Sequence, residues 1–256
     1  MALAQAFAQP ETSMSAIPLG GLLPRHTDLP APRQAERTGA KIVPLPVPGI
    51  SDALQRIGQP MVAPRNRVVH EAGDPANNIY KVVDGTLRVV QLLPDGRRHV
   101  ISFLHAGDYF GLDDNGVYAS AIEAVTDCSL VRYPRRQFDA LLENNASAGW
   151  QIFRLMCHQL TANNRMLLLL GRKTASERMA SFLLGIAERG AGADAETDIK
   201  VSLPMSRGDI ADHLGLTVET VSRLVTKFRQ RKLIQLVSAH ELVIPDLEAL
   251  RELAGD

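Results

Sequence analysis

The pattern of apolar and polar positions changes several times along the chain, and residues 61–134 show the shortest period. Short apolar or alternating runs there are separated by turn signals, as in RVVHEAGD, NIYKVVDG and TLRVVQLLPDGRRHVISFL. Strands of this length with turns at this spacing predict an all-β barrel or roll, which we assign to residues 50–143. The pairs Asp84-Gly85 and Asp95-Gly96 are hairpin signals, because glycine tolerates a positive φ.

Residues 135–189 have a helical period instead. RRQFDALLEN predicts a short helix, and residues 147–170 predict a long one, which we assign to a dimerisation segment at 144–172. Its apolar positions recur at alternating intervals of three and four, as in the a/d seam of a coiled coil, with one asparagine that can fix register. The seam positions are Phe153, Met156, Leu160, Asn163, Leu167 and Leu170. This spacing favours a homodimer; the alternative is a helix packed against its own β-domain.

The C-terminal part, residues 173–256, is expected to form a second and smaller domain. SERMASFLLGIAERG predicts a helix that ends at Gly190, AGADAE a loop, and IKVSLP a strand. Two helices, strands around 233–237 and 241–244, and a terminal helix from about Asp246 follow. Residues 1–49 contain many prolines and no periodicity, which predicts a disordered tail; a partner-binding arm is the alternative.

Two helices near the C-terminus carry clear start and stop signals. Ser206 is a suitable N-cap, and Asp209 three residues later completes a capping pattern. Gly215 ends that helix, and Thr217 can cap the next one. A helix, a short turn containing glycine and a second helix make up the helix-turn-helix motif.

The second of these helices has two different faces. Its expected buried stripe consists of Val218, Val221, Val225 and Phe228. Glu219, Ser222 and Arg223 share an outward face in the first two turns, together with Thr220, where recognition helices meet base edges. Arginine can bind guanine O6 and N7, and glutamate can accept a hydrogen bond from cytosine N4. These four residues are therefore our candidates for reading DNA bases.

Basic residues follow on the same helix and suit contacts to backbone phosphates. The candidate phosphate contacts are Thr217, Lys227, Arg229 and Arg231. The alternative is that Glu219 only complements the helix dipole and that Arg223 only pairs with it. Their joint occurrence on a capped second helix, followed by a basic cluster, favours DNA reading.

Composition and charge limit the other possibilities. The chain has 45% hydrophobic and 22% charged residues with a formal net charge of zero, so any affinity for nucleic acid must come from a local patch. Cys128 and Cys157 are far apart, which argues against a disulfide framework and a thiolate zinc site; both are expected to be small buried residues of a cytoplasmic protein. No stretch reaches the length of a membrane span.

Catalytic and metal-binding motifs are absent from the sequence. It contains no nucleophile elbow, P-loop, H-E-x-x-H or G-x-G-x-x-G, so an enzyme is not expected. His70, His99 and His105 lack the spacing of a ligand set and are interpreted as surface or core residues. No metal or other cofactor is therefore expected.

SRGDIADHLGLTVETVSRLVTKFRQRKLI resembles the Crp/Fnr family of bacterial transcription regulators, and the resemblance covers residues 50 to 256. Within it, E-x-x-S-R at Glu219, Ser222 and Arg223 is similar to the Fnr and FixK branches, while KTASERMASFLL and LPMSRGDIADHLGL favour FixK. The resemblance implies an α+β fold with an N-terminal β-roll (a cyclic-nucleotide-binding-like jelly roll), a long dimerisation helix and a C-terminal winged helix-turn-helix. It also implies a homodimeric activator that binds a TTGA-type palindrome in double-stranded DNA, contacts RNA polymerase and controls genes of microaerobic or anaerobic respiration or nitrogen fixation.

The chain departs from the pattern of the family that it resembles at several ligand positions. Residues 1–49 contain no cysteine, so the iron–sulfur cluster of the Fnr type is not expected. The cyclic-AMP type has Gly-Glu and later Arg-Ser or Arg-Thr around the phosphate, whereas this chain has Gly107-Asp108 and Ala119-Ser120. Ser206 occupies the place of a redox-reactive cysteine found in FixK proteins. We expect a regulator that needs no cyclic nucleotide or cluster; the alternative is a member gated by haem or another small molecule.

Overall fold

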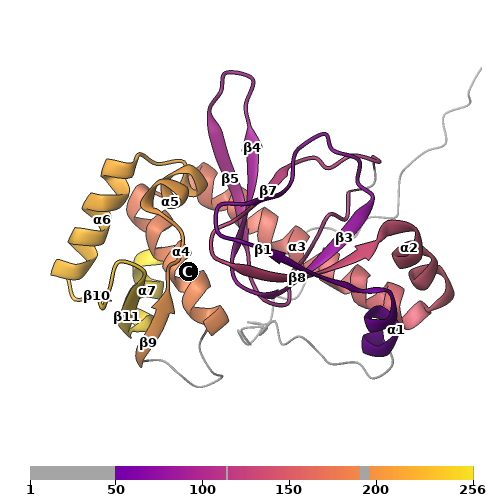
Figure 1. Cartoon of the computed structure of the whole chain (residues 1–256). Helices are drawn as coiled ribbons and strands as arrows, with labels where there is room; N and C mark the ends of the chain where they lie inside the picture. The colour runs from indigo at the N-terminus through magenta and orange to yellow at the C-terminus, as the bar shows by residue number, and fades with distance from the viewer. Residues whose placement is uncertain (1–49, 114, 191–196, 256) are drawn as a thin grey trace, which may run out of the picture. The chain divides into compact units, whose positions relative to one another are not determined.

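The computed structural model describes residues 50–113, 115–190 and 197–255, all within the compact unit Lys41–Asp256 (Figure 1). The disordered tail expected at residues 1–49 and the loop expected at AGADAE lie outside the described residues. The described residues have the expected α+β architecture, with a β-roll, a long helix and a winged helix-turn-helix in chain order.

The described residues of the β-roll, the all-β architecture that the alternating pattern predicted, form two four-stranded antiparallel sheets. In order, the strands of the first sheet are β1 (Gln59–Ala63), β8 (Cys128–Pro134), β3 (Asn78–Asp84) and β6 (Tyr109–Phe110). Those of the second sheet are β2 (Val68–His70), β7 (Ala121–Ala124), β4 (Leu87–Leu92) and β5 (Arg98–Leu104). Apolar side chains from both sheets, including Val82, Leu87 and Leu130, are buried between them.

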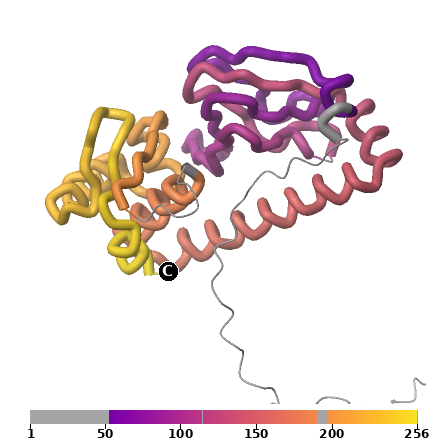
Figure 2. The backbone as a smooth tube through the Cα atoms, turned by 90° about the horizontal axis from the view of Figure 1, so that it is seen from below, coloured from indigo at the N-terminus to yellow at the C-terminus, as the bar shows by residue number. Residues whose placement is uncertain are grey.

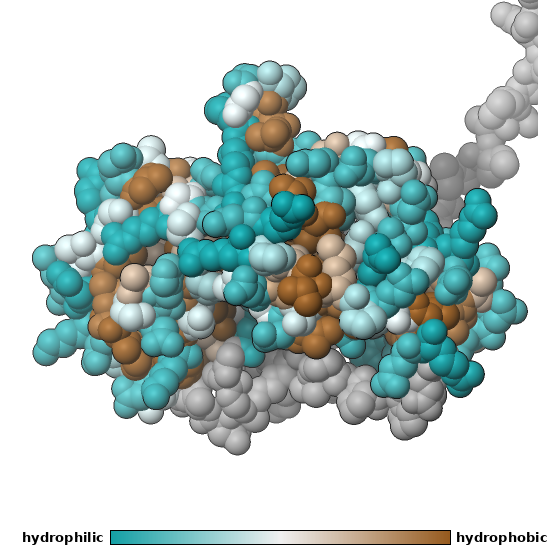
Figure 3. Space-filling model, in the orientation of Figure 1, coloured by the Kyte–Doolittle hydropathy of each residue, from teal (hydrophilic) through white to brown (hydrophobic). Residues whose placement is uncertain are grey.

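Only one of the two hairpin signals marks a hairpin. Strands β4 and β5 pair around Asp95-Gly96, where Gly96 has a φ of 84°, and Figure 3 shows apolar residues on this hairpin. The prediction at Asp84-Gly85 was wrong, because the chain there passes from β3 in the first sheet to β4 in the second. Gly85 has a φ of 92°, and a Cβ on it would lie 2.5 Å from the Asp127 carbonyl oxygen. The glycine permits a close backbone approach at this crossing.

In the described part of the chain, three helices flank the β-roll. Helix α1 (Ile50–Ile57) was not expected; its Leu54 packs with Tyr133 and Phe138. Helices α2 (Arg135–Asn144) and α3 (Ala146–Arg172) are the predicted short and long helices. Asn145 caps α3 by accepting a hydrogen bond from the Ala148 amide. Figure 2 shows α3 as one uninterrupted helix.

The C-terminal part has the elements of a winged helix-turn-helix. In chain order these are α4 (Ala175–Gly190), β9 (Thr197–Ser202), α5 (Arg207–Leu214), α6 (Val218–Gln230), β10 (Gln235–Leu236), β11 (Glu241–Asp246) and α7 (Leu247–Ala254). The antiparallel sheet has the order β10-β11-β9, and α7 packs against α4. The sequence predicted each of these strands and helices; in the structure Asp246 also caps α7 by accepting hydrogen bonds from the Glu248 and Ala249 amides.

The core of the winged domain extends into the β-roll. Val100 and Phe103 of β5 join the buried cluster that contains Leu214 and Phe228, and the Phe103 ring meets His213 edge-on at 5.3 Å. Strand β5 is therefore packed directly against the helix-turn-helix by apolar contacts as well as by the polar contacts described below.

The buried stripe of α6 differs at one position from the prediction. Val221, Val225 and Phe228 are buried as predicted, but Val218 is 45% exposed and the prediction for it was wrong. Val218 is the first residue of the helix and lies before the point where α6 meets the core. The stripe therefore begins at Val221, about one turn after Val218, and it also includes Leu224, which was not predicted.

The two cysteines are in different surroundings. Cys128 is buried, and its Sγ donates to the Thr86 carbonyl oxygen, whereas Cys157 is exposed on α3, so the prediction of burial was wrong for it. Among the described residues, Ala148 is the buried residue of α3, so Cys157 lies on a helix that is largely exposed in the single chain. Among the described residues, no helix is long and apolar enough to cross a membrane.

Candidate nucleic-acid interface

Helix α5 begins and ends as its sequence signals predicted. Ser206 accepts a hydrogen bond from the Asp209 amide at 3.0 Å, and its own amide donates to the Asp209 carboxylate at 3.1 Å. This reciprocal pair is the capping box. Gly215 closes the helix in the left-handed region with a φ of 62°, a conformation that glycine adopts without strain. The turn into α6 is therefore fixed locally.

Helix α6 starts at Thr217, whose hydroxyl accepts a hydrogen bond from the Thr220 amide at 3.2 Å. Thr217 is exposed, so the positive end of the helix dipole faces solvent. Amides and partial positive charge at such a helix start suit a phosphate oxygen. The predicted cap is present, and its proposed phosphate contact remains a prediction.

The predicted base-reading residues lie together on the first two turns of α6. Glu219 and Arg223 are exposed, and Thr220 and Ser222 are half-buried beside them. The Arg223 guanidinium donates weakly to the Thr220 hydroxyl at 3.4 Å. The backbone amide of Glu219 and the Thr217 hydroxyl, aided by the charge of Arg223, hold the pKa of Glu219 below its usual value. One surface therefore displays an ionised acceptor, a hydroxyl and a forked donor.

The basic residues at the end of α6 are also accessible. Lys227, Arg229 and Arg231 are all exposed, the last of them as the C-cap of the helix. Cations near a helix C-terminus are favourable in themselves, which explains part of their placement. They also give α6 a positive end that follows the base-reading face, as expected for phosphate contacts.

A polar cluster joins α5 to the β-roll, and sequence reasoning did not find it. The Arg88 guanidinium donates to the Asp209 carboxylate at 3.0 Å and lies 2.6 Å from Glu123. The Arg98 guanidinium lies 3.1 Å from Asp209 and 2.9 Å from Asp212. We call these five residues the roll–helix cluster. The bonded pair Arg88 and Asp209 is 121 positions apart, so no local pattern signals the cluster.

Comparisons with known proteins agree with this geometry. Residues 177–253 match the Crp-like helix-turn-helix domain, and residues 60–145 match the cyclic nucleotide-binding domain. The nitrogen fixation regulation protein FixK of Azorhizobium caulinodans is 40% identical over 197 residues, which cover 77% of this chain and 79% of that protein. This chain belongs to the Crp/Fnr family of transcription regulators.

Within the Crp/Fnr family the chain is FixK-like. The solved structure of FixK2 from Bradyrhizobium japonicum has a TM-score of 0.71 at 32% identity, and the match covers 77% of this chain and 97% of that one. The transcriptional activator protein FnrL of Cereibacter sphaeroides is 32% identical over 72% of this chain and 76% of its own length. The predicted α+β fold and family are thereby confirmed, and this family consists of DNA-binding regulators rather than enzymes.

A carboxylate and an alanine, Asp108 and Ala119, occupy the positions where the Crp/Fnr resemblance places the phosphate of a cyclic nucleotide. The Asp108 carboxylate accepts the His105 amide at 2.9 Å and lies 3.5 Å from Arg189. Ala119 brings no cation, and its amide donates to the carboxylate of Asp113 at 3.1 Å. Carboxylates where an anion would need a guanidinium oppose its binding.

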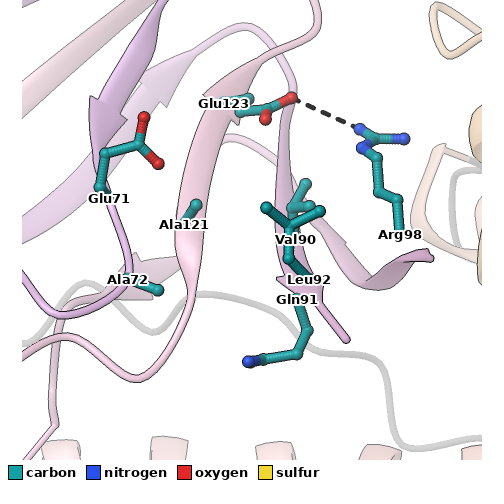
Figure 4. A pocket seen from close by; sticks show the side chains of 8 residues that line it. All are labelled: Glu71, Ala72, Val90, Gln91, Leu92, Arg98, Ala121 and Glu123. Atoms are coloured by element: carbon teal, nitrogen blue, oxygen red, sulfur yellow. Dashed lines mark hydrogen bonds and ion pairs between the residues drawn. The ribbon is translucent and has the colours of Figure 1, made fainter. Parts of the chain in front are cut away.

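A pocket beside the roll–helix cluster is also unsuited to an anion. It has a volume of about 190 Å³. It is lined by Glu71, Ala72, Val90, Gln91, Leu92, Arg98, Ala121 and Glu123 (Figure 4). Two carboxylates face one guanidinium, and Arg98 is already 3.4 Å from Glu123. The electrostatics of this pocket therefore disfavour a phosphate.

The three histidines of the β-roll have different surroundings. His70 is 7% exposed and stacks on Tyr118 with ring centroids 3.6 Å apart, and neither ring nitrogen has a hydrogen-bond partner among the described residues. His99 Nδ1 lies 2.8 Å from the Asp212 carbonyl oxygen, and His105 Nδ1 lies 3.4 Å from the hydroxyl of Thr86. Within the described ranges, no group of three or more His, Cys, Asp or Glu side chains could hold a metal ion.

Helix α3 leaves much of the predicted seam uncovered in the single chain. Phe153, Leu160 and Leu167 are 54%, 61% and 70% exposed, and Asn163 is exposed between them. Met156 and Leu170 are half-buried. Exposed large apolar residues at a/d spacing require a covering surface, which a second copy of α3 would supply.

Proposed function

We propose that this Crp/Fnr protein binds, as a homodimer, a TTGA-type palindrome in double-stranded DNA and activates transcription from it. The observation that carries the proposal is the display of Glu219, Ser222 and Arg223 on one outward face of a capped second helix. The winged core fixes the opposite side of α6, so these side chains face solvent together. The similarity to FixK and to the activator FnrL supports the same reading.

The base-reading step follows from the chemistry of these groups. The Arg223 fork would donate to O6 and N7 of the guanine in TTGA, and the ionised Glu219 would accept from the amino group of a cytosine. Thr220 and Ser222 lie beside them and add hydroxyl donors and acceptors. Each good bidentate pairing contributes about 1–3 kcal/mol of discrimination.

The phosphate contacts would set orientation and overall affinity rather than sequence preference. Thr217 presents the start of α6 to one phosphate, while Lys227, Arg229 and Arg231 lie toward its other end. Because the net charge of the chain is zero, this local patch would be the main source of electrostatic attraction to DNA. Contacts of this kind weaken as salt concentration rises.

A dimer on α3 would place the two copies of α6 in successive major grooves. Half-sites centred about 10–10.5 bp apart lie on one side of the duplex, so a palindrome matches a twofold protein dimer. The exposed seam of Phe153, Leu160 and Leu167 supports this assembly, since its apolar residues are uncovered in the single chain.

We further propose that binding needs neither a cyclic nucleotide nor an iron–sulfur cluster. The carboxylates at Asp108 and Asp113 and the alanine at Ala119 support the first part. The absence of cysteine from residues 1–49 supports the second. The protein would act with RNA polymerase on genes of nitrogen fixation, the process that the name of its FixK relatives gives, or of microaerobic or anaerobic respiration.

A gel-shift titration of the purified full-length protein tests the proposal. At one fixed salt concentration, the palindrome should bind at least about a thousandfold more tightly than a scrambled duplex of the same composition. Equal binding to both would reject sequence-specific recognition. Added cyclic AMP should leave the affinity unchanged; a large gain, or a haem band in the absorption spectrum, would instead indicate a ligand-gated regulator. With RNA polymerase, run-off transcription from a promoter carrying the palindrome should increase.

A further inference from the structure

One guanidinium connects the end of the long helix to the turn of the helix-turn-helix. Arg178, on the first turn of α4, donates from Nη2 to the Leu170 carbonyl oxygen at 2.8 Å and from Nε to that of Lys173 at 2.9 Å. Its Nη1 donates to the Leu214 carbonyl oxygen at 3.0 Å. Three nitrogens of one planar group therefore bind the backbone of two other helices.

These carbonyl groups are ones that a helix cannot satisfy by itself. The last four carbonyl oxygens of an α-helix have no intrahelical partner, and they carry the negative end of its dipole. Leu170 is in the last turn of α3, with Lys173 as its C-cap, and Leu214 is the last residue of α5. Arg178 thus caps two helix ends at once, and its charge is favourable toward both.

The position of this link ties the seam to the recognition helix. Leu170 is the last residue of the predicted seam on α3. Leu214 is followed directly by Gly215, and Thr217 then starts α6. A Cβ on Gly215 would lie 3.5 Å from Arg178 Nη1 and 3.7 Å from Leu170. The end of α3, Arg178 and the turn before α6 are therefore in mutual contact.

We propose that Arg178 is a positioning residue that sets the half-site spacing which the dimer accepts. This inference rests on the proposed function as a palindrome-binding homodimer. In the proposed DNA complex Arg178 touches no base or phosphate. Its role is to fix the start of each α6 relative to the end of each α3. Because the two α3 helices would pair with each other, the two recognition helices would be held at one separation.

The physical basis is the geometry of two-point binding. After one α6 has bound its half-site, the second binds with an effective concentration that is high only where the protein places it. A rigid link raises that concentration at one spacing and lowers it at the others. Loss of the link would let α6 take several positions. The affinity at the preferred half-site spacing would then fall, and neighbouring spacings would be bound almost as well.

The test measures affinity against spacing for full-length protein. Duplexes carry two TTGA-type half-sites at the preferred spacing or with one or two base pairs added or removed, and one duplex carries a single half-site. Wild type should lose at least about tenfold in affinity for each altered spacing. Arg178→Met should bind all spacings within about threefold of one another, with single half-site affinity within about twofold of wild type.

Two further variants complete the comparison. Arg172→Met is the matched control, because Arg172 is exposed at the same end of α3; its spacing profile should equal that of wild type. Arg178→Lys keeps the charge but lacks the planar fork, so its profile should be intermediate. It also provides the measurement if Arg178→Met does not fold.

The possible results separate this inference from the proposed function. An Arg178→Met profile as sharp as that of wild type would overturn the inference, and so would a parallel loss of single half-site and palindrome binding, which indicates a merely structural role. If wild type itself shows no preference for the palindrome, the proposed function fails, and this outcome is visible before any variant is compared.

Discussion

The guanidinium of Arg88 on β4 donates to both carboxylate oxygens of Asp209 on α5, at 3.0 and 3.1 Å. The Asp209 side chain is 5% exposed, and it also closes the capping box with Ser206. Burial opposes ionisation, but the hydrogen bonds from Ser206 and the charges of Arg88 and Arg98 hold the pKa of Asp209 below its usual value. One buried carboxylate therefore starts the first motif helix and joins it to the β-roll.

Asp209→Ala should lower the free energy of unfolding by about 2–4 kcal/mol, since it removes one half of the capping box and leaves two guanidinium groups without their buried partner. Arg88→Met should also be destabilising, because it leaves the Asp209 carboxylate less compensated. Urea unfolding followed by circular dichroism measures both changes.

An exposed ion pair on the same sheet provides the control for Arg88→Met. Arg97 pairs with Asp95 at 2.7 Å in the β4–β5 hairpin, where both side chains are largely exposed. Arg97→Met should leave the urea midpoint essentially unchanged, because solvent screens such pairs. If Arg88→Met has no larger effect than Arg97→Met, the cluster makes no stabilising link between roll and helix.

His70 predicts a pH dependence of stability. Burial lowers the pKa of this histidine below 6.5, so below that pH the unfolded chain binds a proton that the native protein does not. The free energy of unfolding should then fall as pH falls, with this residue contributing up to about 1.4 kcal/mol per pH unit. Well above pH 6.5 the ring is neutral in both the native and the unfolded state, so His70 no longer changes the free energy of unfolding with pH. Urea unfolding between pH 7.5 and 5.5 measures the slope.

The variant His70→Phe should make this slope shallower. Phenylalanine keeps the stack on Tyr118 and removes two buried nitrogens that have no hydrogen-bond partner within the part of the chain that the structure describes. Burial also lowers the pKa of His105 and His213, so part of the slope should persist. The pKa of Asp209 is lowered, so its ionised form stabilises the native protein. This stabilisation is lost only around and below pH 3.8, outside the measured range. Equal slopes for the variant and wild type would show that His70 is not the responsible group.

Local sequence signals predicted the parts of this fold that depend on neighbouring residues. The caps at Ser206 and Thr217 and the stop at Gly215 each involve groups within four positions, so their hydrogen bonds can be anticipated from spacing. The outward face of α6 follows from helical periodicity in the same way. Val218 was misplaced because periodicity does not say where along a helix the core begins.

Contacts between distant residues could not be predicted from the sequence. The residues next to Arg88 in the sequence do not indicate that it pairs with Asp209. The residues next to Arg178 do not indicate that it binds the ends of two helices. Gly85 was read as part of a hairpin, since a positive φ also serves a crossing between two sheets. Such features depend on how elements pack, and packing is decided by the whole chain.

The base-reading and phosphate-binding roles on α6 predict different mutational effects. Arg223→Ala should remove most of the preference for a TTGA-type palindrome over scrambled DNA, because a bidentate contact to guanine contributes about 1–3 kcal/mol of discrimination. Lys227→Ala should instead weaken binding to both duplexes about equally. Gel-shift titrations of each variant on the two duplexes measure the ratio directly.

The salt dependence separates these two roles further. For Lys227→Ala, the fall of log affinity with log salt concentration should become less steep, by about one unit of slope for each half-site. Circular dichroism of both variants checks that α6 remains folded, which is expected because Arg223 and Lys227 are exposed. A full sequence preference in Arg223→Ala would mean that this guanidinium does not read a base.

The exposed seam on α3 predicts the assembly state. Leu160 is 61% exposed in the single chain and occupies a central a/d position, so Leu160→Arg should place two charges in the dimer interface and give monomers in sedimentation velocity. Leu168→Arg is the matched control: it makes the same change on an equally exposed leucine, 64% exposed, outside the seam spacing, and should leave dimers. A stable dimer for Leu160→Arg, with monomers for Leu168→Arg, would move the interface to the other side of α3.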